Sequence, residues 1–483
     1  MASLRAILAA LPFIGIMTVA VVACSSSKDD AGAAGDATKP RPVEAVPTFA
    51  GTVETILQDR CQSCHRAGGI APFPLETYED IKGIAPLAKQ KVVAREMPPW
   101  GAFDDDACKV QHRFKDDLRM TDDELAKFVG WVDSGMPRGD DSMRPAAKAF
   151  PAAGLANKTD TFQMAAPYHI EGGGKDDIRC FPIDPHLAAD QWVGGVNVLP
   201  GNARAVHHVI VFVDPKRESI AKAGAAGSYP CFGGPETSDP ALLVAWAPGA
   251  QPISFAEDTG LKIAKDAMLV MQVHYHPSGG QAADDQSAVE IRRIDGKPSY
   301  AASIILAGNA TSDKDFIKLL PGPADPATGP AFLIPANAKK HTESMELVLP
   351  DTVQSFPLPT MSLLGVGSHM HWAGVDMKIE VERRNPVPGQ PAKECLLGTP
   401  KYDFNWQRGY TFDEPLEKLP TIGAGDKVRF TCTYDNTLEN NNIRRALAEK
   451  QQATPSDIHL GEQTTDEMCL GVLIAVRRAS LVD

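Results

Sequence analysis

The sequence predicts a multidomain fold in which a small all-α domain is followed by antiparallel β-structure. The chain has 483 residues, which is too long for one ordinary hydrophobic core. Apolar residues recur at helical spacing before residue 150, whereas later segments contain β-branched runs. The 40 Gly and 39 Pro residues indicate many turns.

The amino-acid composition argues against two classes of protein, those embedded in a membrane and those that bind nucleic acid. Hydrophobic residues make up 43% of the chain and charged residues 23%, as in a globular protein that is not embedded in a membrane. The formal net charge is −13, which argues against nucleic acid as a partner.

The N-terminus is expected to be an export signal over residues 1–23. Arg5 precedes the apolar run Ile7–Val22, which has the length of a signal peptide and is short for a membrane span. The phrase Val-Val-Ala-Cys ending at Cys24 resembles a bacterial lipobox, so Cys24 is the expected lipidation site. An ordinary signal peptide with a chance cysteine is the alternative. Ser25 after this cysteine favours sorting to the outer membrane.

Residues 24–48 are expected to be a flexible tether. They are rich in Ser, Ala, Gly, Asp and Pro and cannot bury a core. The lipid would be the protein's only membrane contact, with the domains in the periplasm or at the cell surface. Export also places the other cysteines in an oxidising compartment, where disulfides are allowed.

The first chemical motif is Cys61-Gln62-Ser63-Cys64-His65, a C-x-x-C-H sequence typical of c-type heme attachment. The thiols of Cys61 and Cys64 would add to the heme vinyl groups, and His65 would bind iron. A redox C-x-x-C or half of a zinc site needs no such histidine, and no second C-x-x-C follows to complete a zinc site.

Met97 is the expected sixth ligand of the heme iron, with Met120 and Met136 as rivals. Residues 49–141 resemble small bacterial class I-like cytochrome c domains in the phrases Gly68–Phe73, Met97–Trp100 and Trp131–Asp133. Helices are expected over Val53–Cys61 and Thr121–Ser134, the second with a capping-box start. Cys108 and His112 form either a loop pair or a metal-binding pair.

Residues 142–159 are expected to be a linker, after which the pattern becomes strand-like. Trp192–Val198 alternates, and Ala205–Asp214 is a β-branched run that contains His207 and His208. Adjacent strand residues point to opposite faces, so both histidines can bind one metal only if the strand bulges or ends there.

Two further histidine pairs have the spacing of metal ligands. His274-Tyr275-His276 ends an apolar strand, and His369-Met370-His371 lies in the stretch Gly365–Trp372. Residues i and i+2 of a strand share a face, so the two imidazoles of each pair can approach one ion.

Together these motifs resemble the copper type II, ascorbate-dependent monooxygenases, the family of dopamine β-monooxygenase and the peptidylglycine α-hydroxylating enzyme. The resemblance covers about residues 160–480 and includes the phrase Ala245–Ala250. It implies two jelly-roll β-sandwiches, at 160–345 and 346–483, each with one copper. The ligands it implies are His207, His208 and His274 for an electron-storing copper, and His369, His371 and Met468 for the catalytic copper. His276 in place of His274 remains open.

The same resemblance implies the disulfides Cys180–Cys231 and Cys432–Cys469. Cys108 and Cys395 are left over and can either pair or stay free. Imidazole suits copper in both oxidation states and a thioether favours Cu(I), so the ligand types agree with storage at one site and oxygen activation at the other.

The expected activity is hydroxylation of an aliphatic C–H bond with dioxygen, with heme c passing electrons to the three-histidine copper. The substrate is an unknown small molecule and an upstream donor must reduce the heme. Gly367 and Val472 occupy the positions where peptide-amidating members carry a substrate-binding Arg and Tyr, which makes peptidylglycine substrates doubtful. A non-catalytic copper-binding protein and a multi-centre electron-transfer protein are the alternatives.

Overall fold

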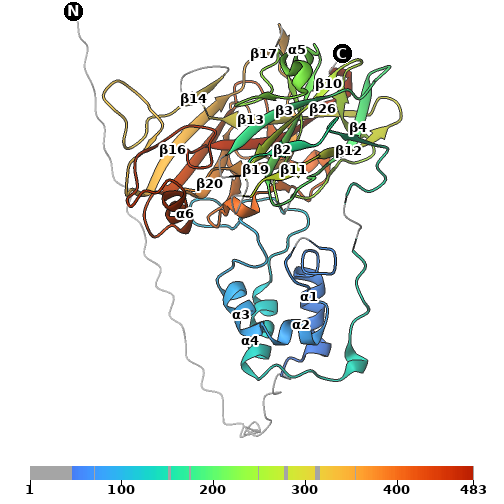
Figure 1. The fold of residues 1–483 in the computed structure, drawn as a ribbon, viewed down its shortest axis with the longest axis vertical. Coiled ribbons are helices and arrows are strands. Elements are labelled where there is room, and N and C mark those ends of the chain that lie inside the picture. Colours follow the sequence, from blue (N-terminus) through green and yellow to red (C-terminus); the bar gives the residue numbers. More distant parts are fainter. Residues whose placement is uncertain are drawn as a thin grey trace, which may run out of the picture. The chain divides into compact units, whose positions relative to one another are not determined.

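The computed structural model describes residues 46–69, 71–150, 154–172, 176–248, 250–276, 281–309, 316–353 and 355–481 (Figure 1). The expected signal peptide, Cys24 and nearly all of the tether lie outside these residues. Within the described ranges, no helix has the length and apolar character needed to cross a membrane. Residues Val46–Asp483 form one compact unit.

The helices of the described residues are short, and half of them lie before residue 150. Their bounds are η1 (Phe49–Val53), α1 (Glu54–Arg60), α2 (Tyr78–Lys82), α3 (Ala85–Val93), α4 (Asp122–Asp133), η2 (Asp141–Met143), α5 (Glu218–Ala223), η3 (Gly224–Ala226), η4 (Phe404–Trp406), η5 (Leu416–Lys418), α6 (Asn441–Glu449) and η6 (Ala479–Leu481). Thr121 caps α4 with the expected capping box. Trp131 of α4 packs with Phe49 and Leu57 in a small buried cluster.

The expected fold class, with a separate all-α cytochrome domain at the N-terminus, is wrong. The described chain is mostly β-structure, and the first helices belong to the same compact unit as the sheets. Residues 98–118, here called the strap, leave the helices as an extended segment. Trp100, Ala102 and Phe114 of the strap are buried in a core cluster that also contains strand residues such as Val366 and Phe430. Apolar side chains of the strap are therefore buried against the β-region and not against the helices.

The largest sheet has fifteen strands, and with the smaller sheets it makes the described β-region largely a β-sandwich. Its strands are β1 (Asp160–Gln163), β3 (Asp177–Ile183), β4 (Gln191–Leu199), β5 (Val206–Asp214), β6 (Tyr229–Pro230), β7 (Ala241–Trp246), β8 (Ile253–Ser254), β9 (Thr259–Ile263), β10 (Met268–Tyr275), β12 (Ala288–Ile294), β13 (Tyr300–Gly308), β19 (Met361–His369), β22 (Gly409–Thr411), β23 (Thr421–Ile422) and β26 (Leu470–Arg478). The strands expected around residues 192–198, 205–214 and 268–277 are β4, β5 and β10.

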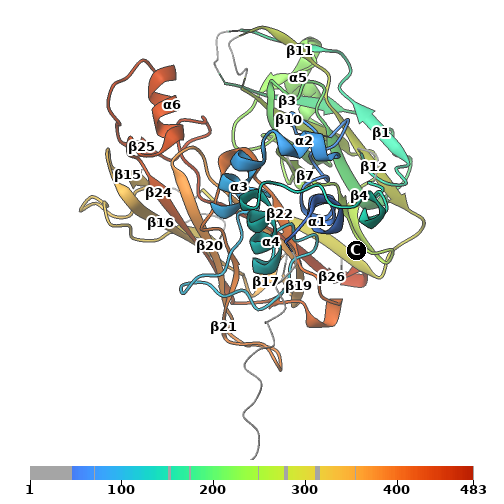
Figure 2. The same ribbon diagram turned by 90° about the horizontal axis from the view of Figure 1, so that it is seen from below.

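A second sheet has the order β14 (Ile317–Leu319), β16 (Lys339–Val348), β24 (Lys427–Asp435), β20 (Gly374–Glu382) and β21 (Lys393–Gly398). Figure 2 shows α6 at the same end of the molecule as β24 and β25. The remaining pairs are β2 (Tyr168–Ile170) with β11 (Ala283–Asp285), β15 (Leu333–Ile334) with β25 (Ile458–His459), and β17 (Thr352–Val353) with β18 (Phe356–Pro357).

The two halves of the β-region share one sheet. β13 pairs along its whole length with β26, and β26 pairs in turn with β19, which carries the His-x-His motif. Strands from residues 160–345 and from residues 346–483 are therefore hydrogen-bonded into a continuous layer. This arrangement fixes the register between the strands that carry the histidines of the two expected copper sites.

Candidate metal centres

A bulge in β5 brings His207 and His208 to one side of their strand. On the neighbouring β10, His274 pairs with His208 and Tyr275 pairs with Val206, so His207 is the extra residue. An unpaired extra residue bends a strand and changes the direction of its side chain. This is the irregularity that two adjacent strand histidines need in order to approach a common point.

The Nδ1 atoms of His207, His208 and His274 converge. The His208 Nδ1 atom lies 3.2 Å from Nδ1 of His207 and 3.4 Å from Nδ1 of His274. All three ligand atoms lie within 4.8 Å of one another, as one metal ion requires. Burial, with the neighbouring histidines, holds the pKa of His207 and His208 well below the ordinary value. Their rings are therefore neutral at pH 7 and present lone pairs to a cation.

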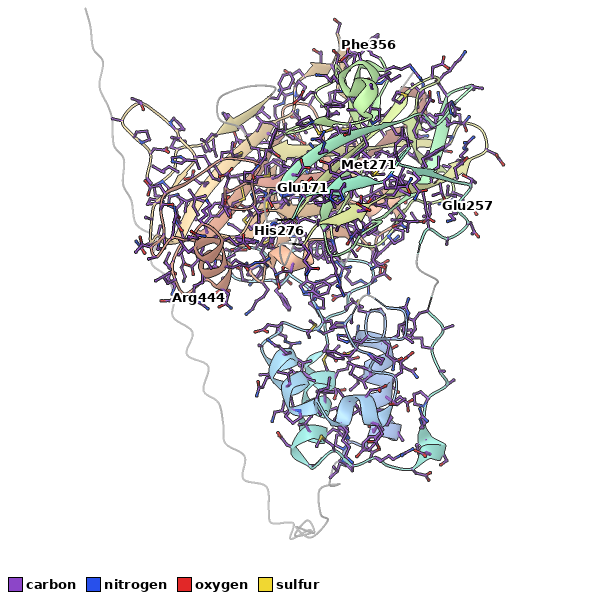
Figure 3. The ribbon with its side chains drawn as sticks, in the orientation of Figure 1. Glu171, Glu257, Met271, His276, Phe356 and Arg444 are labelled. Carbon is purple, nitrogen blue, oxygen red and sulfur yellow. A yellow bond between two sulfur atoms is a disulfide. The ribbon has the colours of Figure 1, made fainter. Side chains whose placement is uncertain are left out.

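Asp176 supports this cluster from the outside. Its Oδ2 atom lies 3.5 Å from His274 Nε2, and its Oδ1 atom lies 2.5 Å from His276 Nδ1. A carboxylate behind a ligating histidine orients the ring and raises its basicity. Of these two histidines, it is His274 whose ring nitrogen lies within 4.8 Å of the ligand atoms of His207 and His208. Figure 3 labels His276, which follows β10.

His369 and His371 form a second pair at the end of β19. Their ring centroids are 5.2 Å apart and the rings are nearly perpendicular. His369 Nδ1 donates to Gln407 Oε1, and His371 Nδ1 donates to the Asp466 carbonyl at 3.2 Å. These acceptors fix the tautomer and leave both Nε2 lone pairs available for a metal. Burial lowers the pKa of His369 to about 4 and that of His371 well below its usual range.

Glu467 joins the His-x-His strand to the segment that carries Met468. The carboxylate is fully buried and accepts hydrogen bonds from the backbone N–H groups of His371 at 2.9 Å, Ala373 at 2.6 Å and Met468 at 3.1 Å. Burial raises the pKa of Glu467 to about 8. Met468 itself is buried, and its carbonyl accepts from the Tyr434 hydroxyl at 2.8 Å.

Three disulfides covalently link segments around these sites. Cys180–Cys231 and Cys432–Cys469 are the two pairs that the resemblance implied. Cys108 and Cys395, whose state the sequence left open, form a third bond. This bond joins the strap to β21.

The three-histidine cluster and the His-x-His pair lie next to each other. The ring centroids of His208 and His369 are 6.1 Å apart. Phe404 stacks on His207 at 4.5 Å and lies 6.1 Å from the ring of His371. The two candidate sites are therefore adjacent, with an apolar ring packed against both.

The C-x-x-C-H segment directly follows α1. His65 Nδ1 donates to the Phe73 carbonyl at 3.0 Å, which leaves Nε2 free for iron. Cys61 and Cys64 form no disulfide. Burial raises the pKa of the Cys61 thiol to about 12. Met97 packs against the same buried cluster as Cys61, but so do its rivals Met120 and Met136.

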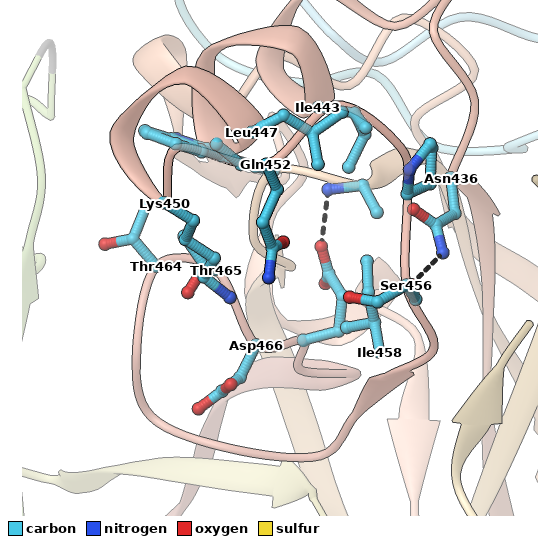
Figure 4. A pocket seen from close by; sticks show the side chains of 15 residues that line it. Asn436, Ile443, Leu447, Lys450, Gln452, Ser456, Ile458, Thr464, Thr465 and Asp466 are labelled. Atoms are coloured by element: carbon cyan, nitrogen blue, oxygen red, sulfur yellow. Dashed lines mark hydrogen bonds between the residues drawn. The ribbon is translucent and has the colours of Figure 1, made fainter. Parts of the chain in front are cut away.

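A pocket lies beside α6, close to the His-x-His pair (Figure 4). Its wall includes Trp372 and Ala373, which follow His371, and Asp466 and Glu467, which precede Met468. Ile443 and Leu447 of α6 supply apolar side chains. The pocket thus borders the segments that hold the second site.

Sequence reasoning identified the candidate ligands but missed most of the residues that position them. Gln407, Phe404 and Asp176 belong to no motif, and only the folded chain brings them to the histidines. Glu467 did carry a signal, because it directly precedes the candidate ligand Met468, yet its contacts with the His371 segment could not be read from sequence.

No protein-family model matches the chain. Among solved structures, the chain is similar to the major capsid protein P2 from Bacteriophage PM2, at 10% identity over 66% of this chain and 96% of that chain, with a TM-score of 0.22. It is also similar to the N-terminal CBM22-1-CBM22-2 tandem domain from Paenibacillus barcinonensis Xyn10C, at 10% identity over 61% and 82%, with a TM-score of 0.15.

Proposed function

We propose that this protein is a copper-dependent monooxygenase that hydroxylates an aliphatic C–H bond of a small molecule. The observation that carries the proposal is the contact between a three-imidazole cluster and a His-x-His pair, with His208 and His369 rings 6.1 Å apart. Two copper ions held there would supply one-electron redox chemistry and dioxygen activation. Imidazole suits copper in both oxidation states, and the Met468 thioether would favour Cu(I) at the second site.

The chain's own residues would prepare both sites for this chemistry. Burial keeps the pKa of His207 and His371 low, so these ligands stay neutral without competition from protons. Gln407 holds the tautomer of His369, and Asp176 supports His274 from behind. The buried Phe404 ring packs against both sites and excludes water from the space that it occupies.

The electron balance requires a donor inside or outside the chain. Hydroxylation consumes dioxygen, two electrons and two protons, and leaves one oxygen atom in the product hydroxyl and the other in water. A heme c on Cys61 and Cys64, with His65 as one axial ligand, would supply electrons singly. Met97 is proposed to be the second protein ligand that would hold the heme iron. An upstream one-electron donor must then reduce the heme.

The substrate is proposed to be small and to lack a carboxylate that needs a cation at the His-x-His strand. Gly367 of β19 lies directly opposite Val472 of β26 in the register of the sheet. These are the positions where the amidating enzymes bind a peptide carboxylate, and here both are apolar. Peptidylglycine is therefore a poor fit.

The test is a screen of candidate small molecules with isotopically labelled dioxygen and copper-loaded, heme-reduced protein. We expect label in a hydroxylated product, and we expect His371→Ala to abolish both product formation and substrate-dependent oxygen uptake. The exposed His459 supplies the matched control, because His459→Ala removes a histidine outside both sites. Undiminished oxygen uptake in His371→Ala with a genuine substrate present would rule out the monooxygenase and favour electron transfer alone.

A further inference from the structure

The loop Phe404–Arg408, here called the junction loop, touches both histidine sites and the strap. Phe404 stacks on His207 of the three-histidine cluster at 4.5 Å. Gln407 accepts the Nδ1–H of His369 through Oε1 and donates from Nε2 to the Phe404 carbonyl at 3.1 Å. Arg408, the next residue, faces the strap.

Arg408 contacts the strap through stacked aromatic rings. Its Cζ atom lies 4.3 Å from the ring centroid of Trp100 and 5.7 Å from that of Tyr410. The two rings are themselves in edge contact at 5.2 Å, and the Tyr410 hydroxyl accepts the backbone N–H of Gly101 at 3.2 Å. A guanidinium over an aromatic face is attracted to the ring, more strongly where water is excluded.

The strap connects this contact to the heme-binding motif. Arg60 directly precedes Cys61, and its guanidinium donates to the Asp117 carbonyl of the strap at 2.9 Å. Two residues earlier, the Lys115 N–H donates to the Thr411 carbonyl of β22 at 2.8 Å. Since β22 pairs with β19 through Tyr410 and Val366, hydrogen bonds link the Cys61 helix to the His369 strand.

Arg408 also has an open hydrogen-bond donor. Its Nε atom is buried and has no hydrogen-bond partner among the described residues. Burial lowers the pKa of Arg408, and the nearby Tyr410, Asp116 and Cys64 oppose that effect. A buried cation with an unused N–H, within electrostatic reach of a heme-attachment cysteine, suits an anionic group such as a heme carboxylate.

We propose that the junction loop is the electron entry of this protein and that Arg408 holds a carboxylate of the heme against it. This inference rests on the proposed function, because it takes heme and copper as the occupants of their sites. One electron crosses at a time: iron goes from ferrous to ferric, copper from Cu(II) to Cu(I), and no bond or proton moves. The hydrogen-bonded route through Gln407 ends at His369, so entry is at the two-histidine site and not, as expected from sequence, at the three-histidine site.

The test measures electron movement inside the full-length, heme- and copper-loaded protein, without oxygen or substrate. The heme is reduced by a light flash, and its reoxidation by Cu(II) is followed in the optical spectrum. We expect Arg408→Gln to slow reoxidation about tenfold or more, because small misplacements between reacting groups carry costs of that size. The heme midpoint potential should also fall, since a positive charge favours the reduced iron.

Three further variants separate the effects of the Gln407 hydrogen bond, of a lost surface charge and of the Arg408 stacking. Gln407→Leu should slow reoxidation and leave the heme potential unchanged. Arg384→Gln removes the same charge from an exposed ion pair with Asp351 and should change neither quantity. If Arg408→Gln folds poorly, Arg408→Lys keeps the charge but loses the planar stacking on Trp100, and should slow reoxidation with little change in potential.

If an Arg408 variant and Gln407→Leu both reoxidise the heme at the wild-type rate, the junction loop is not the electron entry. Hydroxylation driven by a soluble one-electron reductant that reduces copper directly separates this inference from the proposed function. Slow heme reoxidation in an Arg408 variant, with normal product formation under that reductant, supports the junction. If the wild-type protein forms no hydroxylated product but the variants still slow heme reoxidation, the monooxygenase proposal fails. Electron entry through the junction loop is then still supported.

Discussion

Single residues outside the candidate ligand set hold the imidazoles in place. Asp176 reaches both His274 and His276 and also accepts the Thr464 N–H at 3.1 Å. One carboxylate therefore connects β10 with the segment that leads to Glu467. The hydrogen bonds of the two histidines hold the pKa of Asp176 well below its usual range despite burial, so the group is ionised at pH 7.

We expect Asp176→Asn to weaken copper binding at the three-histidine site by about 10- to 100-fold, the usual effect of losing such an outer partner. The amide cannot offer two anionic oxygens, so the His274 ring loses its support. A competitive titration with a Cu(I) chelator measures the affinity.

Asp177→Asn is the matched control, because the neighbouring carboxylate accepts the Tyr168 hydroxyl instead. Equal copper affinities in wild type and Asp176→Asn would show that the carboxylate does not support the ring.

At the scale of single residues, the sequence indicated candidate ligands but not the residues that contact them. His-x-His and the His-His pair are local patterns, and strand geometry limits what each can do. Both adjacent histidines can approach one ion only if the strand bulges or ends at this point. The sequence stated this condition, and the structure contains the bulge at His207. Gln407 lies 38 residues from His369, so only tertiary structure could reveal their hydrogen bond.

Among the elements, the strap is held to β21 by two neighbouring contacts. Cys108 bonds to Cys395, and His112 Nε2 lies 3.0 Å from Oε1 of Glu394, the preceding strand residue. Glu394 also accepts from Arg383 at 2.6 Å, and both side chains of that pair are at most 2% exposed. Burial opposes ionisation, but His112 and Arg383 lower the pKa of Glu394 below its ordinary value.

This geometry predicts a dependence of stability on pH. Because the pKa of Glu394 is lower in the folded chain, its contribution is present above the unfolded value of about 4.5 and is lost as pH falls through the folded value. We expect Glu394→Gln to destabilise the protein near neutral pH by on the order of 3 kcal/mol, since Arg383 is left buried without its anion. Denaturant unfolding across this acid range should show a weaker pH dependence in the variant.

Glu382→Gln is the control on the neighbouring strand, where the exposed pair with Lys393 is screened by water. Its stability should stay near that of wild type. The same acid dependence in wild type and Glu394→Gln would assign the effect to other carboxylates.

The strap also explains why the expected fold class failed. The helices and strands themselves follow from periodicity, as α4, β5 and β10 do. The segment between the helices carries Trp100 and Phe114, and nothing in the local sequence says which core will bury them. They joined the core of the β-region, and the helices did not close into a domain of their own.

For the whole molecule, the shared sheet is what brings the two candidate copper sites together. β13 and β26 join the strands of the two halves, and the His208 and His369 rings end 6.1 Å apart. The sequence implied two sandwiches with one copper each, but it could not give the distance between them, because that distance depends on pairing between residues far apart in the chain.

The adjacency predicts magnetic interaction between the two coppers. In a heme-free variant, Cys61→Ala with Cys64→Ala, we expect dipolar broadening of the Cu(II) spin-resonance spectrum when both sites are filled. Adding His371→Ala should empty one site and restore narrow lines. Two filled sites with independent, narrow spectra would show that the histidine clusters are separated in solution.

The bond between Cys108 and Cys395 spans 287 residues and so sets an order of assembly. The covalent ring that it closes contains His207, His274 and His369, whereas the C-x-x-C-H motif lies outside it. The segment before Cys108 can fold as soon as it is made, while the ring can close only after β21 exists. A cut in a loop within this ring would also leave both fragments covalently joined until the bond is reduced.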